Sequence, residues 1–272
     1  MIWIKDLKNK KHQVVIQKIK TKMSYQQYRP NRFSVLPPVV KNLLIINGLF
    51  FLASMVFSSN LGIDLDTTLG LHYPLSQAFR PWQLVSYMFM HGSFMHLFFN
   101  MFALWMFGNT LENLWGSKRF LIYYMVTGIG AALIQMTVTY IRLMPLYEQV
   151  SPDTLNMIMT QGADIIQSGK NFIDPVAGEI NGLINTATIG ASGAVFGILL
   201  AFGMLFPNTM LYIYFAIPIK AKWFVILYGA MELFSGIANN PTDNVAHFAH
   251  LGGMLFGFIL IKIWQKRSNS FY

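Results

Sequence analysis

The sequence predicts an all-α membrane protein, a six-transmembrane-helix bundle with short amphipathic helices in its loops. Hydrophobic residues make up 54% of the 272 residues and charged residues 11%, whereas soluble domains carry roughly 25% charged residues. Apolar windows of about 20 residues, the length that spans a bilayer, recur along the chain. They place the expected spans at 39–57, 94–111, 120–140, 192–206, 223–237 and 245–263.

Charge is distributed unevenly around these spans. The net charge is +9, and ten lysines and arginines, the last of them Lys41, precede or abut the first span. The loop at 143–189 is instead acidic, with five carboxylates and only Lys170 as a basic residue. Because cytoplasmic loops are enriched in Lys and Arg, both termini are expected in the cytoplasm. We interpret the basic segment as a topology determinant or an anionic-lipid contact, and expect no nucleic-acid partner.

One membrane domain at 39–264 is expected, between a basic cytoplasmic segment at 1–38 and a cytoplasmic tail at 265–272. Its outer loop, 143–189, forms an insert. There Ser151 and Pro152 form the start signal of an amphipathic helix that ends near Gly169.

Two further segments are too short or too polar to cross. Residues 210–219 are apolar but short, and predict an interfacial hairpin or a re-entrant piece. A polar stretch at 23–31 separates the first basic residues from the first apolar run, so a cleaved secretory signal is not expected. The sequence has no cysteine, which excludes disulfides and a thiolate nucleophile.

Polar side chains lie inside three of the expected spans. Ser192 opens the fourth span and His250 lies near the start of the sixth, while the entry to the second carries His91, just before the span, and His96 and Asn100 within it. All three spans start at the outer side, so these groups should gather in one leaflet. Ionisable residues inside a membrane are functional-site candidates by default. Ser192 and His250 are the natural nucleophile and general base. His96 and Asn100 in the second span are four residues apart and therefore project from one helix face.

Small residues accompany the polar ones. Gly193 and Gly197 form a small-xxx-small pair in the fourth span, and Gly253 and Gly257 form a matching pair in the sixth. Such pairs let helix backbones approach closely. A serine and a histidine on two different helices can meet at hydrogen-bond distance only if those helices pack tightly.

Three motifs in this order resemble the rhomboid family of intramembrane serine proteases: His96-x-x-x-Asn100, Gly190-Ala-Ser192-Gly and Ala249-His250-x-x-Gly253-x-x-x-Gly257. The resemblance covers roughly residues 82–264, and the motifs are specific only in combination. It implies a Ser-His dyad without an acid. Ser192 would attack the substrate carbonyl, and His250 would carry its proton to the leaving amine. His96, Asn100 and the Ser192 backbone N–H would bind the oxyanion.

The resemblance also implies supporting positions. His91 stands where the family has a histidine at the cavity mouth, and Gly190 and Gly193 flank the nucleophile. Phe196 replaces a tyrosine that packs on the catalytic histidine in bacterial rhomboids. Glu112 matches a position that ties inner helix ends together, and is expected to be structural.

Two ionisable residues compete with these assignments. The family register, three residues before Gly253, selects His250 over His247. We interpret His247 as a rim group or as a group that supports the catalytic residues from behind. We interpret Glu232, in the fifth span, as a neutral or snorkelling structural group, with a proton relay as the alternative.

The expected function is hydrolysis of a peptide bond in or next to the transmembrane helix of a single-pass membrane protein, without cofactor or metal. A catalytically silent rhomboid-like binder of membrane proteins is one alternative, although such proteins normally lack the serine or the histidine. A transporter lined by the four membrane histidines is another, but transport predicts broken helices at mid-membrane. The expected location is a bacterial inner membrane, and the oligomeric state stays open.

Overall fold

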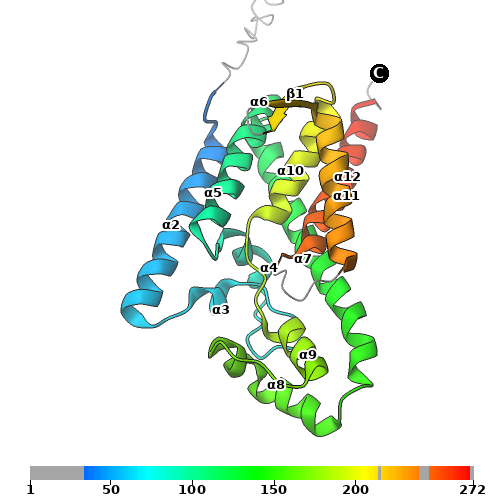
Figure 1. The fold of residues 1–272 in the computed structure, drawn as a ribbon. Coiled ribbons are helices and arrows are strands. Elements are labelled where there is room, and N and C mark those ends of the chain that lie inside the picture. The colour runs from blue at the N-terminus through cyan, green and yellow to red at the C-terminus, as the bar shows by residue number, and fades with distance from the viewer. Residues whose placement is uncertain (1–33, 214–215, 239–244, 270–272) are drawn as a thin grey trace, which may run out of the picture. The chain divides into compact units, whose positions relative to one another are not determined.

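The computed structural model describes residues 34–213, 216–238 and 245–269. Most of the basic segment expected at 1–38, and the last residues of the carboxyl-terminal tail, therefore lie outside the described residues. The described residues form a mostly helical bundle (Figure 1).

Every expected span corresponds to a helical segment. These segments are α2 (Pro38–Leu61), α5 (Phe94–Ala103) with η2 (Leu104–Gly108) and α6 (Asn109–Trp115), α7 (Ser117–Tyr147), α10 (Ser192–Leu205), α11 (Ala221–Ala238) and α12 (His247–Asn269). In the described part of the chain, α2, α7, α11 and α12 are long and apolar enough to cross a membrane individually. The second span is built from three consecutive pieces, because a π-helical turn, η2, joins α5 to α6.

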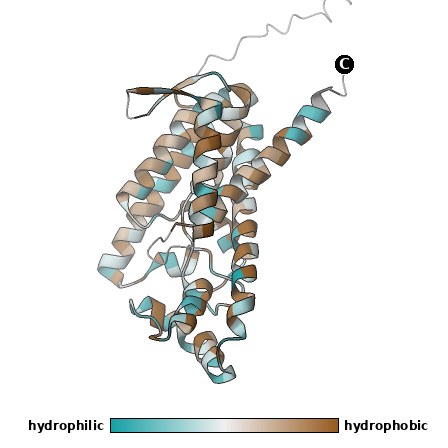
Figure 2. Ribbon diagram, turned by 45° about the vertical axis from the view of Figure 1, so that its right-hand side comes forward, coloured by the Kyte–Doolittle hydropathy of each residue, from teal (hydrophilic) through white to brown (hydrophobic). Residues whose placement is uncertain are grey.

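The outer surface of the bundle is apolar, as lipid contact requires. Figure 2 shows that hydrophobic residues dominate the long helices. Large hydrophobic side chains such as Leu49 on α2, Phe99 on α5 and Phe234 on α11 are exposed. In water such a surface would mark an aggregation or interaction site, whereas on a membrane-spanning helix it faces the acyl chains.

Helix α10 lies in the centre of the bundle and is short. Most of its residues are buried, from Gly193 to Gly203. Its 14 residues extend about 21 Å, less than the roughly 30 Å of a hydrocarbon core. The irregular segment before it, which we call the lead-in (186–191), continues the chain past α4 (Gln83–Ser86) (Figure 1). Leu71 and Thr188 exchange two backbone hydrogen bonds, of 2.9 and 2.8 Å, that anchor this lead-in.

Glycines bring three helices into close contact. A Cβ on Gly253 of α12 would overlap the carbonyl of Gly193 on α10, so these two backbones touch as predicted. Gly197 and Gly257 instead make room for α7. The Tyr123 hydroxyl of α7 donates to the Gly197 carbonyl at 2.8 Å, and it would overlap a Cβ on Gly257. The glycines therefore allow the close helix approach expected from the sequence, and Gly197 and Gly257 extend it to α7.

Glu112 fastens the amino terminus of α2 to the end of α6. Helix α2 has no side-chain cap of its own. The buried Glu112 carboxylate accepts hydrogen bonds from the backbone N–H groups of Val39 and Val40, at 2.9 and 2.8 Å, and from the Ser117 hydroxyl at 2.6 Å. It therefore caps α2 and holds the first residue of α7 through its hydroxyl, which agrees with the structural role expected for it.

Short helices gather at the end of the bundle opposite the start of α2 (Figure 1), which we call the loop end. They are α3 (Leu65–Leu69), α4, η1 (Tyr87–Phe89), α8 (Pro152–Gln167) and α9 (Pro175–Asn185). Ser151 caps α8 by accepting from Thr154 N at 3.1 Å, which confirms the predicted helix start. Helix α9 is an addition to the prediction. Asp174 before Pro175 carries the same start signal, and accepts from the Ala177 N–H.

The short apolar segment between α10 and α11 forms an antiparallel hairpin, β1 (Met210–Ile213) with β2 (Ile217–Lys220). Met210 pairs with Lys220, and the hairpin lies near the same end of the bundle as the start of α2 (Figure 1). Of the two structures expected for 210–219, the hairpin is therefore correct.

The backbone contact between α10 and α12 generates a stability prediction. Changing Gly253 to alanine places a methyl group on the Gly193 carbonyl, and overpacking of this kind costs about 1–3 kcal/mol. We expect Gly253→Ala to lower the midpoint of thermal unfolding of the detergent-solubilised protein. Gly48→Ala in α2 is the matched control, because its Cβ meets no described atom within 4 Å. Equal midpoints for the two variants would contradict the proposed contact.

Candidate active site

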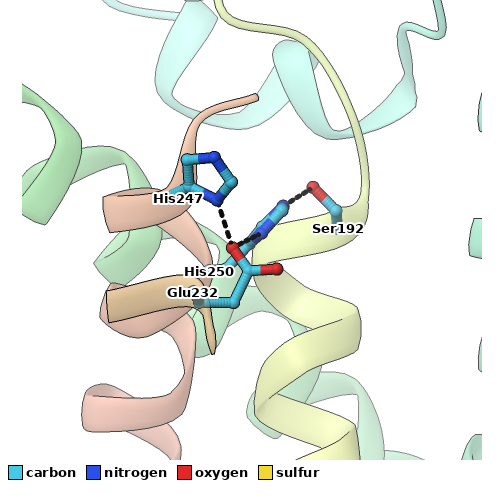
Figure 3. Close-up of polar contacts among 4 residues, drawn as sticks. All are labelled: Ser192, Glu232, His247 and His250. Carbon is cyan, nitrogen blue, oxygen red and sulfur yellow. Dashed lines mark hydrogen bonds and ion pairs between the residues drawn. The ribbon is translucent and has the colours of Figure 1, made fainter. Parts of the chain in front are cut away.

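Ser192 and His250, distant in sequence, lie side by side in the bundle. Ser192 is the first residue of α10, and His250 lies in the first turn of α12. The Ser192 hydroxyl oxygen is 2.8 Å from Nε2 of His250, a hydrogen-bond distance (Figure 3). His250 is buried and Ser192 half-buried. The structure thus brings together the two residues that the sequence singled out as nucleophile and base.

Gly190 shapes the chain in front of the serine. Its φ of 130° is a conformation that side chains disfavour, and its N–H donates to the Tyr87 carbonyl at 2.9 Å. A Cβ at Gly190 would lie 2.8 Å from Nε2 of His96 and 3.5 Å from the Ser192 hydroxyl oxygen. Glycine is therefore required here, and the His96 ring lies against the backbone just before the nucleophile.

Phe196 fixes the plane of the His250 ring. The two rings are stacked, with centroids 4.2 Å apart and an angle of 4° between their planes. Phe196 in turn packs on Tyr228 of α11, at a centroid distance of 4.8 Å. The stacking surface expected from the sequence is present without a hydroxyl at position 196.

The polar residues at the start of α5 form a second group beside Gly190. Ser93 caps this helix by accepting from the His96 N–H. The buried Asn100 donates one amide hydrogen to the His96 carbonyl at 3.0 Å, and has a second amide hydrogen left to donate. His91, in the loop before α5, contacts His96 edge to face at 4.9 Å. Burial, aided by the neighbouring His96, lowers the pKa of His91 to about 4, so its ring packs there uncharged at neutral pH.

Glu232 of α11 is the residue whose position the sequence analysis did not foresee. Its Oε2 lies 2.8 Å from Nδ1 of His250 and 2.7 Å from Nδ1 of His247 (Figure 3). Only 5% of Glu232 is exposed. The interpretation as a snorkelling group is therefore wrong, because the carboxylate points into the bundle and bonds both histidines. The signal was present in the sequence, since Glu232 lies in the outer half of its expected span, at the level of the other polar groups.

His247 lies beside the site without reaching the serine in the contacts seen here. Its ring is at 6.4 Å from that of His250, at a right angle, and both bond the same carboxylate oxygen. This position, behind the carboxylate that bonds His250, corresponds to the supporting place of the two that were expected, and the role of His247 stays a prediction.

The hydrogen bonds determine what the site can do chemically. A carboxylate oxygen only accepts, so Nδ1 of His250 carries the hydrogen that points to Glu232. In the neutral ring Nε2 then has a free lone pair, and it can accept the hydroxyl hydrogen of Ser192. The side-chain atoms of Glu232, His247 and His250 that could serve as metal ligands lie within 4.8 Å of one another. These three residues could hold a metal ion, but the hydrogen bonds already account for their arrangement.

Sequence comparison adds the family. Residues 78–146 and 155–267 match the Rhomboid domain family. The chain belongs to the rhomboid family. The match coincides closely with the resemblance inferred over 82–264, and it implies a six-transmembrane bundle, with α5–η2–α6 and the short α10 as the second and fourth crossings. The chain is accordingly a multi-pass membrane protein.

Three relatives illustrate the range of this rhomboid family. A mitochondrial rhomboid protein of Schizosaccharomyces pombe is 28% identical over 215 residues, 70% of this chain and 53% of that protein. The rhomboid-family protein YdcA of Bacillus subtilis is 24% identical over 86% of this chain and 94% of its own length. Rhomboid protease GluP of the same bacterium is 38% identical over 52 residues, 19% of this chain and 10% of that protein. The chain thus spans about half of the first relative and nearly all of the second.

Removing the ring that stacks on His250 should impair the site without dismantling it. Aromatic pairs are worth about 0.5–1.5 kcal/mol, so we expect Phe196→Ala to slow fluorophosphonate labelling of Ser192 by roughly 2- to 12-fold. Phe196→Tyr keeps the stacking surface and should label at the wild-type rate. Both variants should be compared at matched folded fractions. Equal labelling of Phe196→Ala and wild type would show that the stack does not orient the imidazole.

Proposed function

We propose that this rhomboid is an intramembrane serine endopeptidase that hydrolyses a peptide bond in or next to the transmembrane helix of single-pass membrane proteins. The observation that carries the proposal is the 2.8 Å separation between the Ser192 hydroxyl and Nε2 of His250, inside an apolar helical bundle. A hydroxyl held by a basic nitrogen is the arrangement of an activated nucleophile. The name of the relative GluP, a rhomboid protease, supports the same reaction class.

The reaction follows from this pair. Nε2 of His250 takes the hydroxyl hydrogen while the Ser192 oxygen bonds to the substrate carbonyl carbon. The tetrahedral intermediate collapses when the imidazolium returns that proton to the amine nitrogen, which leaves, and the acyl group stays on Ser192 as an ester. A water molecule, deprotonated by the same nitrogen, then hydrolyses the ester and restores the hydroxyl.

The negative oxygen of the intermediate needs donors near Ser192. We assign this role to the Ser192 backbone N–H and to the side chains of His96 and Asn100. Two observations support the assignment. His96 Nε2 and the Ser192 hydroxyl both lie close to the position that a Cβ on Gly190 would take, and Asn100 has an amide hydrogen left to donate. Donors fixed in a site that excludes bulk water contribute strongly, because they need no reorganisation as charge develops.

The proposed setting is a bacterial inner membrane, with both termini in the cytoplasm and the site open to the outer leaflet. The acidic carboxylates of α8, α9 and their flanks lie at the loop end, whereas basic residues precede α2 and occupy the last turns of α12. That asymmetry matches the enrichment of cytoplasmic segments in Lys and Arg. The substrates are single-pass membrane proteins, and the proposed chemistry uses neither cofactor nor metal.

Loss of either member of the pair should abolish cleavage. In liposomes containing a single-pass test substrate, we expect Ser192→Ala and His250→Ala to lower kcat by about 10⁴-fold or more. Ser59→Ala, on the exposed face of α2, is the matched control and should cleave normally. Undiminished cutting by Ser192→Ala would remove the proposal. Intact folding with no cleavage by the wild type would instead favour the silent binder.

The oxyanion assignment has its own test. Removing one such donor costs about 2.7–4 kcal/mol in other serine proteases, so we expect Asn100→Ala to lower kcat by about 10²–10³-fold with little change in KM. Asn156→Ala, on the exposed surface of α8, controls for the loss of an amide. A rise in KM at constant kcat would place Asn100 in substrate binding instead.

A further inference from the structure

The proposed protease site contains a buried carboxylate that a Ser-His dyad does not require. We infer that Glu232 is a positioning residue that turns the pair into a Ser192–His250–Glu232 triad, holding the imidazole in its basic tautomer and stabilising the imidazolium that forms during the reaction. The inference rests on the proposed function and extends it to a third residue.

Geometry is the first support. The His250 ring lies between two partners, with its Nε2 at 2.8 Å from the Ser192 hydroxyl and its Nδ1 at 2.8 Å from Oε2 of Glu232 (Figure 3). The three side chains come from three helices, α10, α12 and α11. A carboxylate on one ring nitrogen and a hydroxyl on the other is the order of groups in which a serine protease moves a proton.

Burial is the second support. Glu232 is 5% exposed on a helix whose sequence is otherwise almost entirely apolar. A carboxylate in such a place is costly unless it is paired and hydrogen-bonded. A merely structural contact between α11 and α12 does not require a charged side chain. A carboxylate beside His250, in contrast, attracts the ring more strongly once that ring is protonated. Its attraction is therefore larger in the transition state than in the resting enzyme, which is the condition for accelerating the reaction.

His247 supplies the third support by orienting the carboxylate. Its Nδ1 lies 2.7 Å from the same oxygen that binds His250. With two N–H groups donating to Oε2, the carboxylate cannot rotate away without losing both bonds. The cost of burying it is thus offset in the resting state, and its oxygen stays aligned with Nδ1 of His250.

The proton balance is simple. The Ser192 hydroxyl hydrogen moves to Nε2 of His250, and the hydrogen on Nδ1 stays between the ring and Glu232. The carboxylate remains deprotonated throughout, and faces the imidazolium until Nε2 returns its proton to the leaving amine. No further reactant is needed beyond the water of hydrolysis.

The test compares Glu232→Gln and Glu232→Asp with wild type in the liposome cleavage assay, using the full-length protein. The glutamine variant removes the charge at nearly constant shape, and we expect kcat to fall by about 10²–10⁴-fold with KM within about twofold. The aspartate variant retains the charge but draws its oxygen back from Nδ1 of His250, because its side chain is one methylene shorter; its kcat should fall below wild type and stay at least about tenfold above the glutamine variant. Glu179→Gln, an exposed residue of α9 paired with Arg142 at 3.2 Å, is the matched control and should cleave at the wild-type rate.

Each result decides between a positioning role and a structural one. A glutamine variant with a wild-type melting transition and a kcat within threefold of wild type overturns the inference. If the glutamine variant does not fold, the aspartate variant decides: a reduced kcat at unchanged KM supports the inference, and a wild-type kcat overturns it. Loss of wild-type activity on chelation, restored by Zn²⁺, would also overturn it, because Glu232 would then be a metal ligand.

The same experiment separates this inference from the proposed function. If Ser192→Ala cleaves as well as wild type, the protease assignment itself fails. If wild type cleaves, Ser192→Ala does not, and Glu232→Gln is as active as wild type, then only the role of Glu232 fails. Fluorophosphonate labelling of Ser192 gives an independent readout, since the glutamine variant should label more slowly in proportion to its loss of kcat.

Discussion

The backbone contact between Gly193 and Gly253 is the constraint on which the rest of the site depends. Two side chains as short as serine and histidine can bond across a helix pair only when the helix axes come unusually close. Here Gly253 has no Cβ, so the backbone of α12 contacts the Gly193 carbonyl of α10. Ser192 is the residue next to Gly193, and His250 lies about one turn before Gly253, so the close approach of the two helices lies beside the hydrogen bond between them.

The polar side chains of the site form one continuous chain of hydrogen bonds through an apolar bundle. It runs from Ser192 through His250 to Glu232, where His247 joins it. Each group would be costly in hydrocarbon alone, and each is balanced by its neighbour. This network of polar bonds ties α11 to α10 and α12. Apart from Glu232, the described buried residues of α11 are only Ala221 and Val225.

Much of this architecture could be predicted from the sequence, because spanning helices must be both long and apolar. The six spans followed from apolar windows, and the gathering of polar groups at one level followed from the predicted sidedness. The choice of His250 over His247 as the partner of Ser192 rested on the resemblance to the rhomboid motif. Three features could not be predicted in this way. Helix α9 is short and carries only a cap signal, and the contact of Gly257 with Tyr123 depends on helix rotation, which large neighbouring side chains set. The bonds from Glu232 to the two histidines of α12 depend on how α11 and α12 are rotated about their axes. The sequence of a single span does not reveal that rotation.

The shortness of α10 has a consequence for hydration. A helix that stops well before the membrane surface leaves the remaining depth to non-helical chain, whose peptide groups must find partners within the protein or in a wet cavity. The lead-in meets part of this need through Leu71 and Tyr87. The proposed hydrolysis would consume water that an acyl-chain environment cannot supply, and the short α10 leaves the Ser192 hydroxyl beside irregular backbone instead of inside a regular spanning helix.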